Sequence, residues 1–456
     1  MSRKYFKQVL ISLLFLLNFS SLWAQAIDFS GEARLMGAYS NKEELPFWMY
    51  SNQRGRIAET SNVSAGLNAY GIYNFEGNKT FEFGGGLAFS DGLEKELFID
   101  EAYLAYSNSW LEVVTGIKHK AEMYNGLSAS NRNILWSLNA RALPGVQLGT
   151  NGTVFFKGRE LGWGFEATLE EYWLGEDRYV KDAFLHHKSL HLVFKSWNGW
   201  KLKAGIQHFA QWGGTSPRFG KQPAGIEDYL RIFAGRAGGD NSLESDKANV
   251  LGNHLGSWEL YVTREFKDFK ARFIFNNLFE DGSGSRGANF PDGRYGVFID
   301  FSEKDRIINS FIYEFYYTRD QSQTGPHLYD NYFNNGVYPS GWTYKSRILG
   351  VPFFTYDRDS DMVVNNKFSA HHFGVSGQFS TYFNTYPYKL MLSYAHNEGT
   401  FQKPLHEDGT NEDVFYFYSE VRLINRPFQL NIELGTEFNS YKEPVFGAGL
   451  HLSKSL

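Results

Sequence analysis

The sequence contains no cysteine among its 456 residues. This absence excludes disulfide bonds, cysteine-ligated zinc, iron–sulfur clusters, a thiol nucleophile and a lipid-modified N-terminal cysteine. Basic residues are not in excess either, since 45 Lys and Arg stand against 50 Asp and Glu, so we expect no nucleic-acid partner. Beyond the N-terminus no stretch approaches the ~18 apolar residues of a membrane-spanning helix. Aromatic residues are abundant instead, at 18% of the chain, which is too many for a disordered protein.

The N-terminus has the pattern of an export signal. Three basic residues precede an apolar stretch at 9–19, and small residues follow up to Ala24. The apolar stretch is too short for a transmembrane helix, so the pattern predicts a secretory signal peptide over 1–24. Its removal leaves 42 basic against 50 acidic residues, a net charge of −8, on a single mature domain at 25–456.

Apolar and polar residues alternate along most of the mature chain. The alternation begins at 27–37 and recurs at 311–318 and 430–439, among other places. A period of two is typical of β-strands. Stretches of about ten residues fit tilted transmembrane strands and exceed the five or six residues usual in soluble sandwiches. We count roughly eighteen such stretches, and 143–172 divides ambiguously.

The connections between these stretches fall into two classes by parity. The even-numbered ones are short and rich in the Asn, Gly, Asp and Pro of tight turns, at 76–78, 107–109, 151–152, 198–199, 267–268 and 425–427. The odd-numbered ones include all the long connections, at 41–61, 119–142, 211–255, 280–293, 319–369 and 397–413. This separation predicts an all-β, antiparallel transmembrane barrel of about eighteen strands, with short periplasmic turns and long extracellular loops. The alternative is a secreted β-sandwich or propeller, but no repeat at blade spacing is present.

Six loop segments carry distinctive sequences in a fixed order. They are LPFWMYSNQRG at 45–55, SLNARALP at 137–144, HFAQWGGTSP at 208–217, LGNHLGS at 251–257, FEDGSG at 279–284, and YFNNG at 332–336 with SGWTY at 340–344. Together they resemble the Wzi-type capsule-assembly family of outer-membrane proteins, in its Bacteroidetes-like branch, over most of the mature chain. The resemblance implies an eighteen-stranded barrel whose outer face is a lectin for capsular polysaccharide. The chain departs from enteric members, which have an N-terminal helical plug on the periplasmic side, because strand alternation already begins at Ile27.

The predicted outer loops contain residue types that suit sugars. Aromatic rings stack on sugar rings, and Arg binds the carboxylates of acidic sugars. The candidate polysaccharide-binding residues are Trp48, Trp212, Arg218, Arg231, Arg236, Trp342 and Arg347. For each tryptophan the alternative is packing within the loops or in an aromatic girdle.

Charged residues on strands are predicted to face the lumen. The candidates for a salt-bridge network there are Arg272, Glu314, Glu420, Arg422, Glu433 and Glu437. Their mixed signs favour mutual pairing over an ion-selective pore.

We expect no enzyme, metal site or cofactor. No nucleophile elbow or Ser/His/Asp order is present. The carboxylate pairs at 100–101 and 170–171 are adjacent in strands, so their side chains are predicted to diverge and not to act together. The acidic residues at 357–361 lack the Gly and distal Glu of a calcium loop.

The sequence therefore predicts a monomeric outer-membrane lectin that contacts outer-membrane lipid and lipopolysaccharide. It would bind capsular or other surface polysaccharide and assist capsule assembly and retention at the cell surface. One alternative is a passive porin for oligosaccharides or other solutes, since a barrel of about eighteen strands is wide enough for a channel. Another is a secreted, soluble glycan-binding β-protein.

Overall fold

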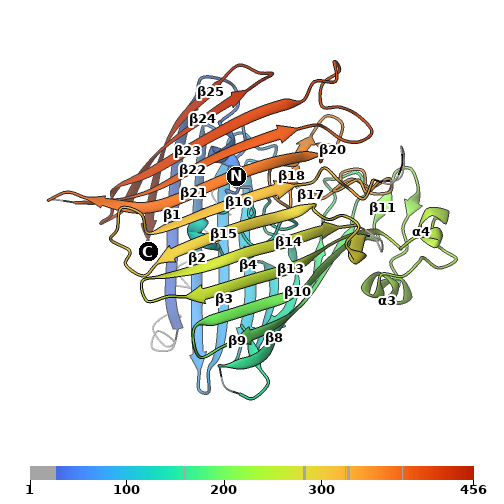
Figure 1. Cartoon of the computed structure of the whole chain (residues 1–456), viewed down its shortest axis with the longest axis horizontal. Coiled ribbons are helices and arrows are strands. Elements are labelled where there is room, and N and C mark those ends of the chain that lie inside the picture. Colours follow the sequence, from blue (N-terminus) through green and yellow to red (C-terminus); the bar gives the residue numbers. More distant parts are fainter. Residues whose placement is uncertain (1–26, 159, 281–283, 324, 326–328, 383) are drawn as a thin grey trace, which may run out of the picture.

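The computed structural model describes residues 27–456 except 159, 281–283, 324, 326–328 and 383. The signal peptide predicted at 1–24 lies outside these described residues. Over the described part of the chain, 18 antiparallel strands form a closed barrel (Figure 1). The predicted fold class is thereby confirmed.

The barrel strands are long and follow one another around the wall. They are β1 (Ile27–Ser40), β2 (Val63–Phe75), β3 (Lys79–Ser90), β4 (Leu97–Ser107), β5 (Leu111–Ile117), β6 (Pro144–Thr150), β8 (Gly162–Trp173), β9 (Phe184–Lys195), β10 (Trp200–Trp212), β13 (Asn253–Glu265), β14 (Phe269–Phe279), β15 (Gly293–Phe301), β16 (Ser310–Tyr317), β21 (Phe368–Ser380), β22 (Thr385–Asn397), β23 (Glu412–Ile424), β24 (Gln429–Asn439) and β25 (Val445–Ser455). The ambiguous region contains one further short strand, β7 (Val154–Phe155), which pairs with β8 below β6.

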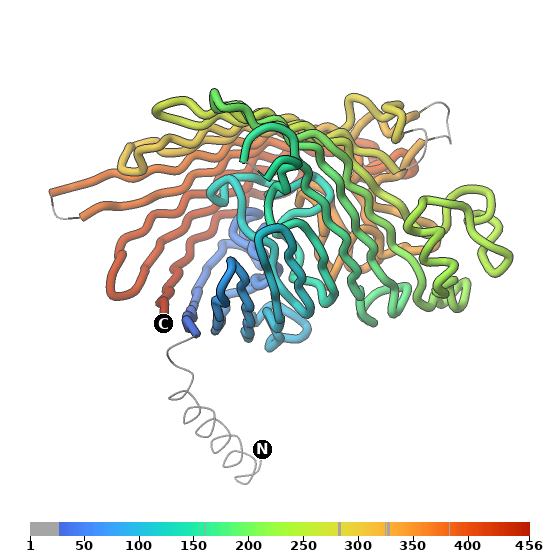
Figure 2. The backbone as a smooth tube through the Cα atoms, turned by 90° about the horizontal axis from the view of Figure 1, so that it is seen from below, coloured from blue at the N-terminus to red at the C-terminus, as the bar shows by residue number. Residues whose placement is uncertain are grey.

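The first and last strands close the barrel. β1 pairs with β2 on one side and with β25 on the other, with Glu32 opposite Ser455 and Ser40 opposite Gly447. Figure 2 shows the C-terminal end of the chain beside the first strand. Closure leaves no open sheet edge. A lipid environment requires this, because unpaired backbone N–H and C=O groups cannot be satisfied there.

The two ends of the barrel differ as the parity of the connections predicts. Even-numbered connections are turns of three or four residues at most positions, and we call their end of the barrel the turn end. The predicted turn at 151–152 is longer, because β7 extends that connection to residue 161. The other end, called the loop end, holds 41–62, 118–143, 213–252, 280–292 and 318–367.

The loop end contains the short elements. They are α2 (Phe47–Tyr50), η1 (Tyr124–Gly126), β11 (Thr215–Ser216), β12 (Gly220–Lys221), α3 (Ile226–Ala234), α4 (Glu244–Ala248), η2 (Gly284–Arg286), β17 (Thr343–Tyr344), β18 (Arg347–Ile348), β19 (Thr355–Asp357) and β20 (Met362–Asn365). In the described ranges, no helix combines the length and the apolar character needed to cross a membrane.

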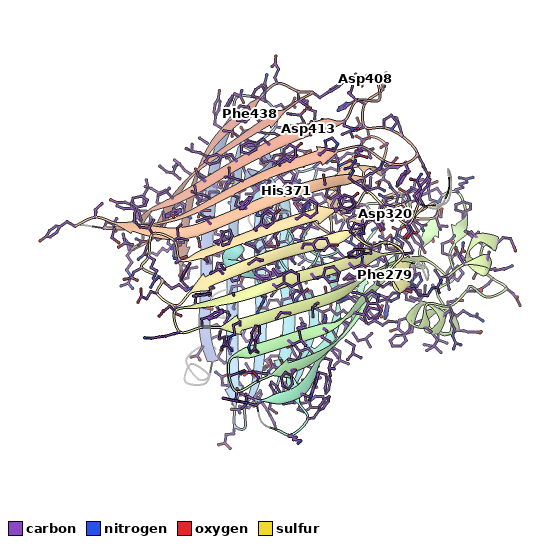
Figure 3. All side chains as sticks on the ribbon, in the orientation of Figure 1. Phe279, Asp320, His371, Asp408, Asp413 and Phe438 are labelled. Atoms are coloured by element: carbon purple, nitrogen blue, oxygen red, sulfur yellow. The ribbon has the colours of Figure 1, made fainter. Side chains whose placement is uncertain are left out.

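The strand alternation gives the barrel an apolar outer wall and a polar interior. On β24, Leu434 is about half exposed on the outer wall, whereas its neighbour Glu433 is fully buried inside. His371 and Phe438 also lie on the outer wall (Figure 3). Exposed aromatic side chains mark both rims, with Trp110, Trp163, Trp197 and Trp200 at the turn end and Tyr39, Trp173, Tyr394 and Phe438 at the loop end. An apolar band between aromatic girdles is typical of outer-membrane barrels.

The main hydrophobic core lies inside the barrel, where loops fold inward. Its members come largely from 41–62, 118–143 and 318–367, together with inward side chains of the strands. We call these three segments the plug. The lumen is therefore filled from the loop end.

The register on β24 predicts how the wall responds to charge. Leu434→Arg places a cation near the middle of the lipid-facing band and should destabilise the inserted barrel by about 2–4 kcal/mol. Asn431→Arg is the matched control, because Asn431 faces the lumen and donates a 2.7 Å hydrogen bond to Glu420. Heat-induced unfolding in lipid vesicles should separate the two variants, and equal stability would contradict the register.

Candidate functional site

The plug segment 118–143 is anchored inside the barrel by a buried ion pair. Arg294 on β15 and Glu314 on β16 are both fully buried, with Nη2 of the guanidinium 2.5 Å from Oε1 of the carboxylate. The same carboxylate accepts hydrogen bonds of 2.8 Å from the Ser128 hydroxyl and from the backbone N–H of Ala129. Since a buried charge is costly without partners, these contacts fix the segment across the lumen.

Two buried tryptophans tie the other plug segments to the wall and to each other. The indole N–H of Trp48 donates to Ser393 Oγ on β22 at 3.0 Å. The indole N–H of Trp342 donates to the carbonyl of Leu135, in segment 118–143, at 2.8 Å. Both rings are almost entirely shielded from solvent. The plug is therefore one packed unit rather than three independent loops.

Further contacts of the plug reach opposite sides of the wall. Lys120 donates to Glu170 on β8 at 2.7 Å, and burial lowers the pKa of the Lys120 ammonium although Glu170 opposes that shift. His372 on β21 lies 2.7 Å from the carbonyl of Leu127. Together with the Glu314 anchor, these contacts attach the plug to strands around the barrel.

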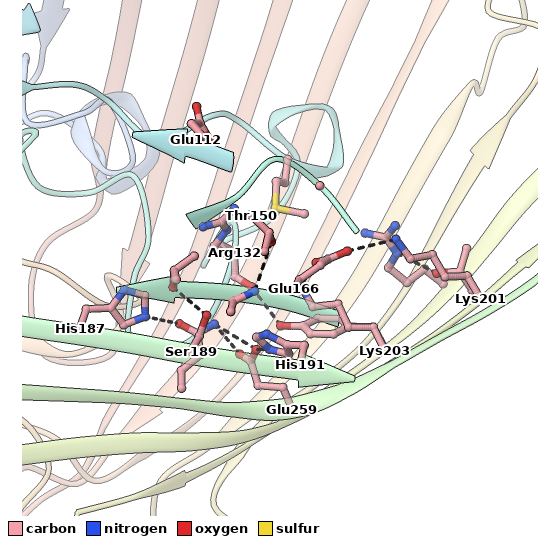
Figure 4. Close-up of a pocket in the computed structure, with 18 of the residues that line it drawn as sticks. Glu112, Arg132, Thr150, Glu166, His187, Ser189, His191, Lys201, Lys203 and Glu259 are labelled. Carbon is pink, nitrogen blue, oxygen red and sulfur yellow. Dashed lines mark hydrogen bonds and ion pairs between the residues drawn. The ribbon is translucent and has the colours of Figure 1, made fainter. Parts of the chain in front are cut away.

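A polar cavity of about 330 Å³ lies in the lumen between the plug and the turn end. Figure 4 shows Glu166, Lys203, His191 and Glu259 among the side chains that line it. Glu166 accepts from Lys203 at 2.7 Å, and His191 lies 2.5 Å from Glu259. The lining as a whole holds three carboxylates and four Lys or Arg side chains, so opposite charges are mixed within the cavity.

The six predicted lumen residues form separate clusters rather than one network. Arg272 lines the cavity, and Glu314 belongs to the plug anchor. The Tyr418 hydroxyl lies within hydrogen-bond distance of both Glu420 and Glu433, at 3.0 and 2.9 Å. Arg422 joins this cluster, because it donates to Asn431 at 3.3 Å and Asn431 donates to Glu420 at 2.7 Å, whereas Glu437 lines a cleft at the loop end. The predicted network is found in part: Glu420, Arg422 and Glu433 are linked, whereas Glu314 pairs with Arg294 and Arg272 donates to Thr263 at 3.1 Å.

Sequence reasoning also missed a carboxylate pair on β4. A register irregularity opposite Gly86 and Leu87 inserts Asp100 as an extra residue, so that Asp100 and Glu101 are both buried. Asn68 donates to both carboxylates, at 3.1 and 3.3 Å. The prediction that these side chains diverge is wrong, because a β-bulge turns the extra residue toward the same side.

The pair at 170–171 does diverge as predicted. Glu170 contacts Lys120 and His187 in the lumen. Glu171 contacts His186 and accepts from Tyr229 of α3 outside the wall. Over the described ranges no three His, Cys, Asp or Glu side chains group closely enough to hold a metal ion.

A groove of about 1020 Å³ opens at the loop end between 213–252, 280–292 and 318–367. Its polar and aromatic lining includes Arg218, Phe219, His254, Arg286, Tyr329, Asn331, Asn334 and Asn335, together with the carboxylates of Asp246, Glu280 and Asp330. Arginine, amide and aromatic groups together match the chemistry of sugar carboxylates, hydroxyls and ring faces.

One wall of the groove is held by Asp292. Its carboxylate accepts from the backbone N–H groups of Asp320 and Gln321, at 3.0 and 2.6 Å, and from the Tyr332 hydroxyl at 2.8 Å. Burial raises the pKa of the Asp292 carboxyl to about 7, although these hydrogen bonds favour its ionised form. The contacts join 280–292 to the plug segment 318–367, so the groove has a preformed wall.

Of the seven predicted sugar-binding residues, Arg218 lines the groove and is exposed. Arg236 is exposed nearby but does not line it, and Arg231 is paired with Glu227 at 3.0 Å. Arg347 is buried in a separate cleft, where it donates to the carbonyl of Ile57 at 3.0 Å. The predicted arginines therefore do not converge on one site.

The three predicted tryptophans are buried. Trp48 and Trp342 pack in the plug, and Trp212 packs against Phe184 and Tyr229 outside the wall. These positions do not favour stacking on a polymer and match the packing alternative considered above. The residues missed were Arg286, Tyr329 and the asparagines of the YFNNG segment, for which the amide-rich sequence was the available signal.

No protein-family profile and no curated protein matches this sequence. Among solved structures, the chain is similar to Wzi of Escherichia coli, an outer-membrane protein involved in group 1 capsule assembly and described as a carbohydrate-binding β-barrel. That similarity has a TM-score of 0.59 at 12% identity and covers 95% of this chain and 86% of Wzi. OccK5 (OpdH) of Pseudomonas aeruginosa gives a TM-score of 0.53 at 9% identity, over 95% of this chain and 98% of OccK5. At such low sequence identities these structural similarities establish the fold alone, which is that of an outer-membrane β-barrel.

Proposed function

We propose that this protein is an outer-membrane lectin that holds capsular or other surface polysaccharide in the groove at its loop end. The groove carries the proposal, because it presents guanidinium, carboxylate, amide and aromatic groups above a lumen filled by the plug. The likeness to Wzi, described as binding carbohydrate, supports the same function. In this role the protein assists capsule assembly and retention at the cell surface.

The groove chemistry suits a polysaccharide that carries both carboxylate and hydroxyl groups, because its lining combines two arginines with the carboxylates of Asp246, Glu280 and Asp330. Arg218 and Arg286 are both exposed and line the groove. Guanidinium groups bind carboxylates through paired, charge-assisted hydrogen bonds. Phe219 and Tyr329 also line the groove, with the Phe219 ring 4.9 Å from the Arg218 guanidinium and the Tyr329 ring 4.8 Å from the Phe401 ring. Many weak contacts along one polymer give avidity, so retention does not require a tight site.

The apolar wall supports residence in the outer membrane, with the loop end facing outward. Exported barrels of this kind have short turns on the periplasmic side and long loops on the cell surface. In that orientation the wall contacts lipid and lipopolysaccharide. The closed sheet needs no second copy to satisfy its edges, so we propose a monomer.

The main alternative is a passive porin. It requires an open path through the plug, whereas Trp48, Trp342 and Glu314 are buried in plug contacts. Conductance across a planar bilayer distinguishes the two functions, because a plugged lectin should conduct poorly. Open-barrel conductance by the unmodified protein would favour the porin.

The binding function predicts a specific effect of groove arginines. Arg218→Ala combined with Arg286→Ala should weaken binding of an acidic polysaccharide at least about tenfold, since each hydrogen bond to a charged group contributes about 1.5–3 kcal/mol. Binding is measured on the purified barrel, and the ratio of cell-bound to released polysaccharide is measured on cells.

The matched control removes the same charge from the opposite end. Arg306 and Arg426 lie in turn-end connections, so replacing both with alanine should leave binding unchanged. If both double variants bind like the unmodified protein, the groove is not the site. If total polymer falls instead of its retention, the protein acts earlier in export.

A further inference from the structure

Helix α3 (Ile226–Ala234) lies outside the barrel wall at the loop end. Ile232 packs in a cluster with Ala210 and Trp212 of β10, and the Tyr229 hydroxyl donates to Glu171 of β8 at 2.8 Å. Figure 1 shows α3 and α4 projecting from the loop end beside β10. The helix is thus fixed to the exterior of the wall rather than to the plug.

The sequence of α3 divides its surface into three strips. Tyr229 and Ile232 face the wall, as their contacts show. Glu227 and Arg231 form an ion pair of 3.0 Å on a polar strip. The remaining strip consists of Ile226, Leu230 and Phe233, which are 78%, 59% and 41% exposed. Their spacing of four and three residues places them on one helix face.

The C-terminal end of this apolar strip lies beside the lipid-facing wall, next to Lys188. Lys188 of β9 donates to the carbonyl of Phe233 and also lies over the Phe233 ring, with Nζ 4.2 Å from the ring centroid. Two and four residues farther along β9, Leu190 and Leu192 are exposed on the outer wall. The C-terminal end of α3 therefore reaches the level at which the apolar band begins.

We propose that α3 lies in the outer-leaflet interface, with Ile226, Leu230 and Phe233 inserted among the acyl chains of outer-leaflet lipid. An amphipathic helix binds a membrane in this way, with its apolar face at the acyl boundary and its charged face toward headgroups and water. Segment 213–252 contributes both α3 and Arg218 of the groove. Lipid contact by α3 then fixes the position of segment 213–252, and with it one side of the groove, relative to the membrane. This proposal does not depend on carbohydrate binding.

The absence of cysteine allows a direct test with single nitroxide labels. Leu230→Cys, Glu227→Cys and Leu192→Cys are each labelled in the full chain and reconstituted in vesicles of phosphatidylethanolamine and phosphatidylglycerol. Collision with oxygen, which concentrates in lipid, is compared with collision with a water-soluble nickel chelate. We expect the oxygen-to-nickel ratio at residue 230 to exceed that at residue 227 severalfold and to approach that at residue 192.

The controls make failure informative. Residue 227 lies on the polar strip of the same helix, and residue 192 reports insertion of the barrel itself. A low ratio at 230 together with a high ratio at 192 overturns the proposal while leaving the membrane barrel intact. Spin–spin broadening at 230 that disappears on dilution with unlabelled protein would identify a second copy as the occupant and also overturn it.

Discussion

Replacing Trp342 with alanine is expected to lower the free energy of unfolding by about 3–5 kcal/mol, the usual cost of truncating a buried tryptophan. The ring is fully buried, 5.3 Å from the Phe209 ring in an edge-to-face arrangement. Its indole N–H donates to the carbonyl of Leu135, so truncation removes a hydrogen bond between two plug segments as well as packing. The effect should appear in heat- or denaturant-induced unfolding of the purified barrel.

The control for this variant is Trp197→Ala. Trp197 is 88% exposed at a turn-end connection. In detergent its loss should change the free energy of unfolding by no more than about 0.5 kcal/mol, the usual range for surface substitutions. Similar stability of the Trp342 and Trp197 variants would contradict the packed plug. Trp342→Ala should weaken polysaccharide retention only indirectly, in proportion to its loss of plug stability. The arginine variants, in contrast, should weaken it in a fully stable barrel.

The barrel could be predicted from the sequence because lipid imposes a simple rule on every strand. Side chains alternate between lipid and lumen, and this rule gave the opposite placement of Leu434 and Glu433 correctly. Parity of the connections also followed from the sequence, since tight turns require Asn and Gly. The prediction of a tight turn at 151–152 was wrong, because β7 also pairs with β8 and lengthens the connection. No local sequence pattern indicates this second pairing.

The loops could not be predicted to the same depth. Whether Trp342 faces a polymer or the interior depends on Leu135, which lies 207 positions away in the chain. The paired orientation of Asp100 and Glu101 depends on one extra residue against β3, and an alternation pattern conceals such a bulge. Arg218 was identified because its residue type suits acidic sugars. Arg286 was missed because only the meeting of two distant loops places it in the groove.

Replacing Glu314 with alanine should both destabilise the plug and raise conductance. The substitution leaves the Arg294 guanidinium buried without its carboxylate, which typically costs about 3–5 kcal/mol. It also removes the acceptor of the Ser128 hydroxyl and the Ala129 N–H, which hold segment 118–143 in the lumen. We therefore expect a lower unfolding temperature and more frequent openings in planar bilayers.

Two further variants distinguish the specific effect of breaking the Arg294–Glu314 pair from the general effect of removing a carboxylate. Glu265→Ala removes a carboxylate that lies 3.3 Å from Lys270, but both groups are about half exposed at the turn end. Its cost should stay below about 1 kcal/mol with no change in conductance. Glu314→Ala combined with Arg294→Met should recover part of the stability, because no unpaired buried charge remains. If Glu314→Ala unfolds and conducts like the unmodified barrel, the ion pair does not hold the plug. If it is destabilised without added conductance, the remaining contacts of Trp48 and Trp342 suffice to keep the lumen closed.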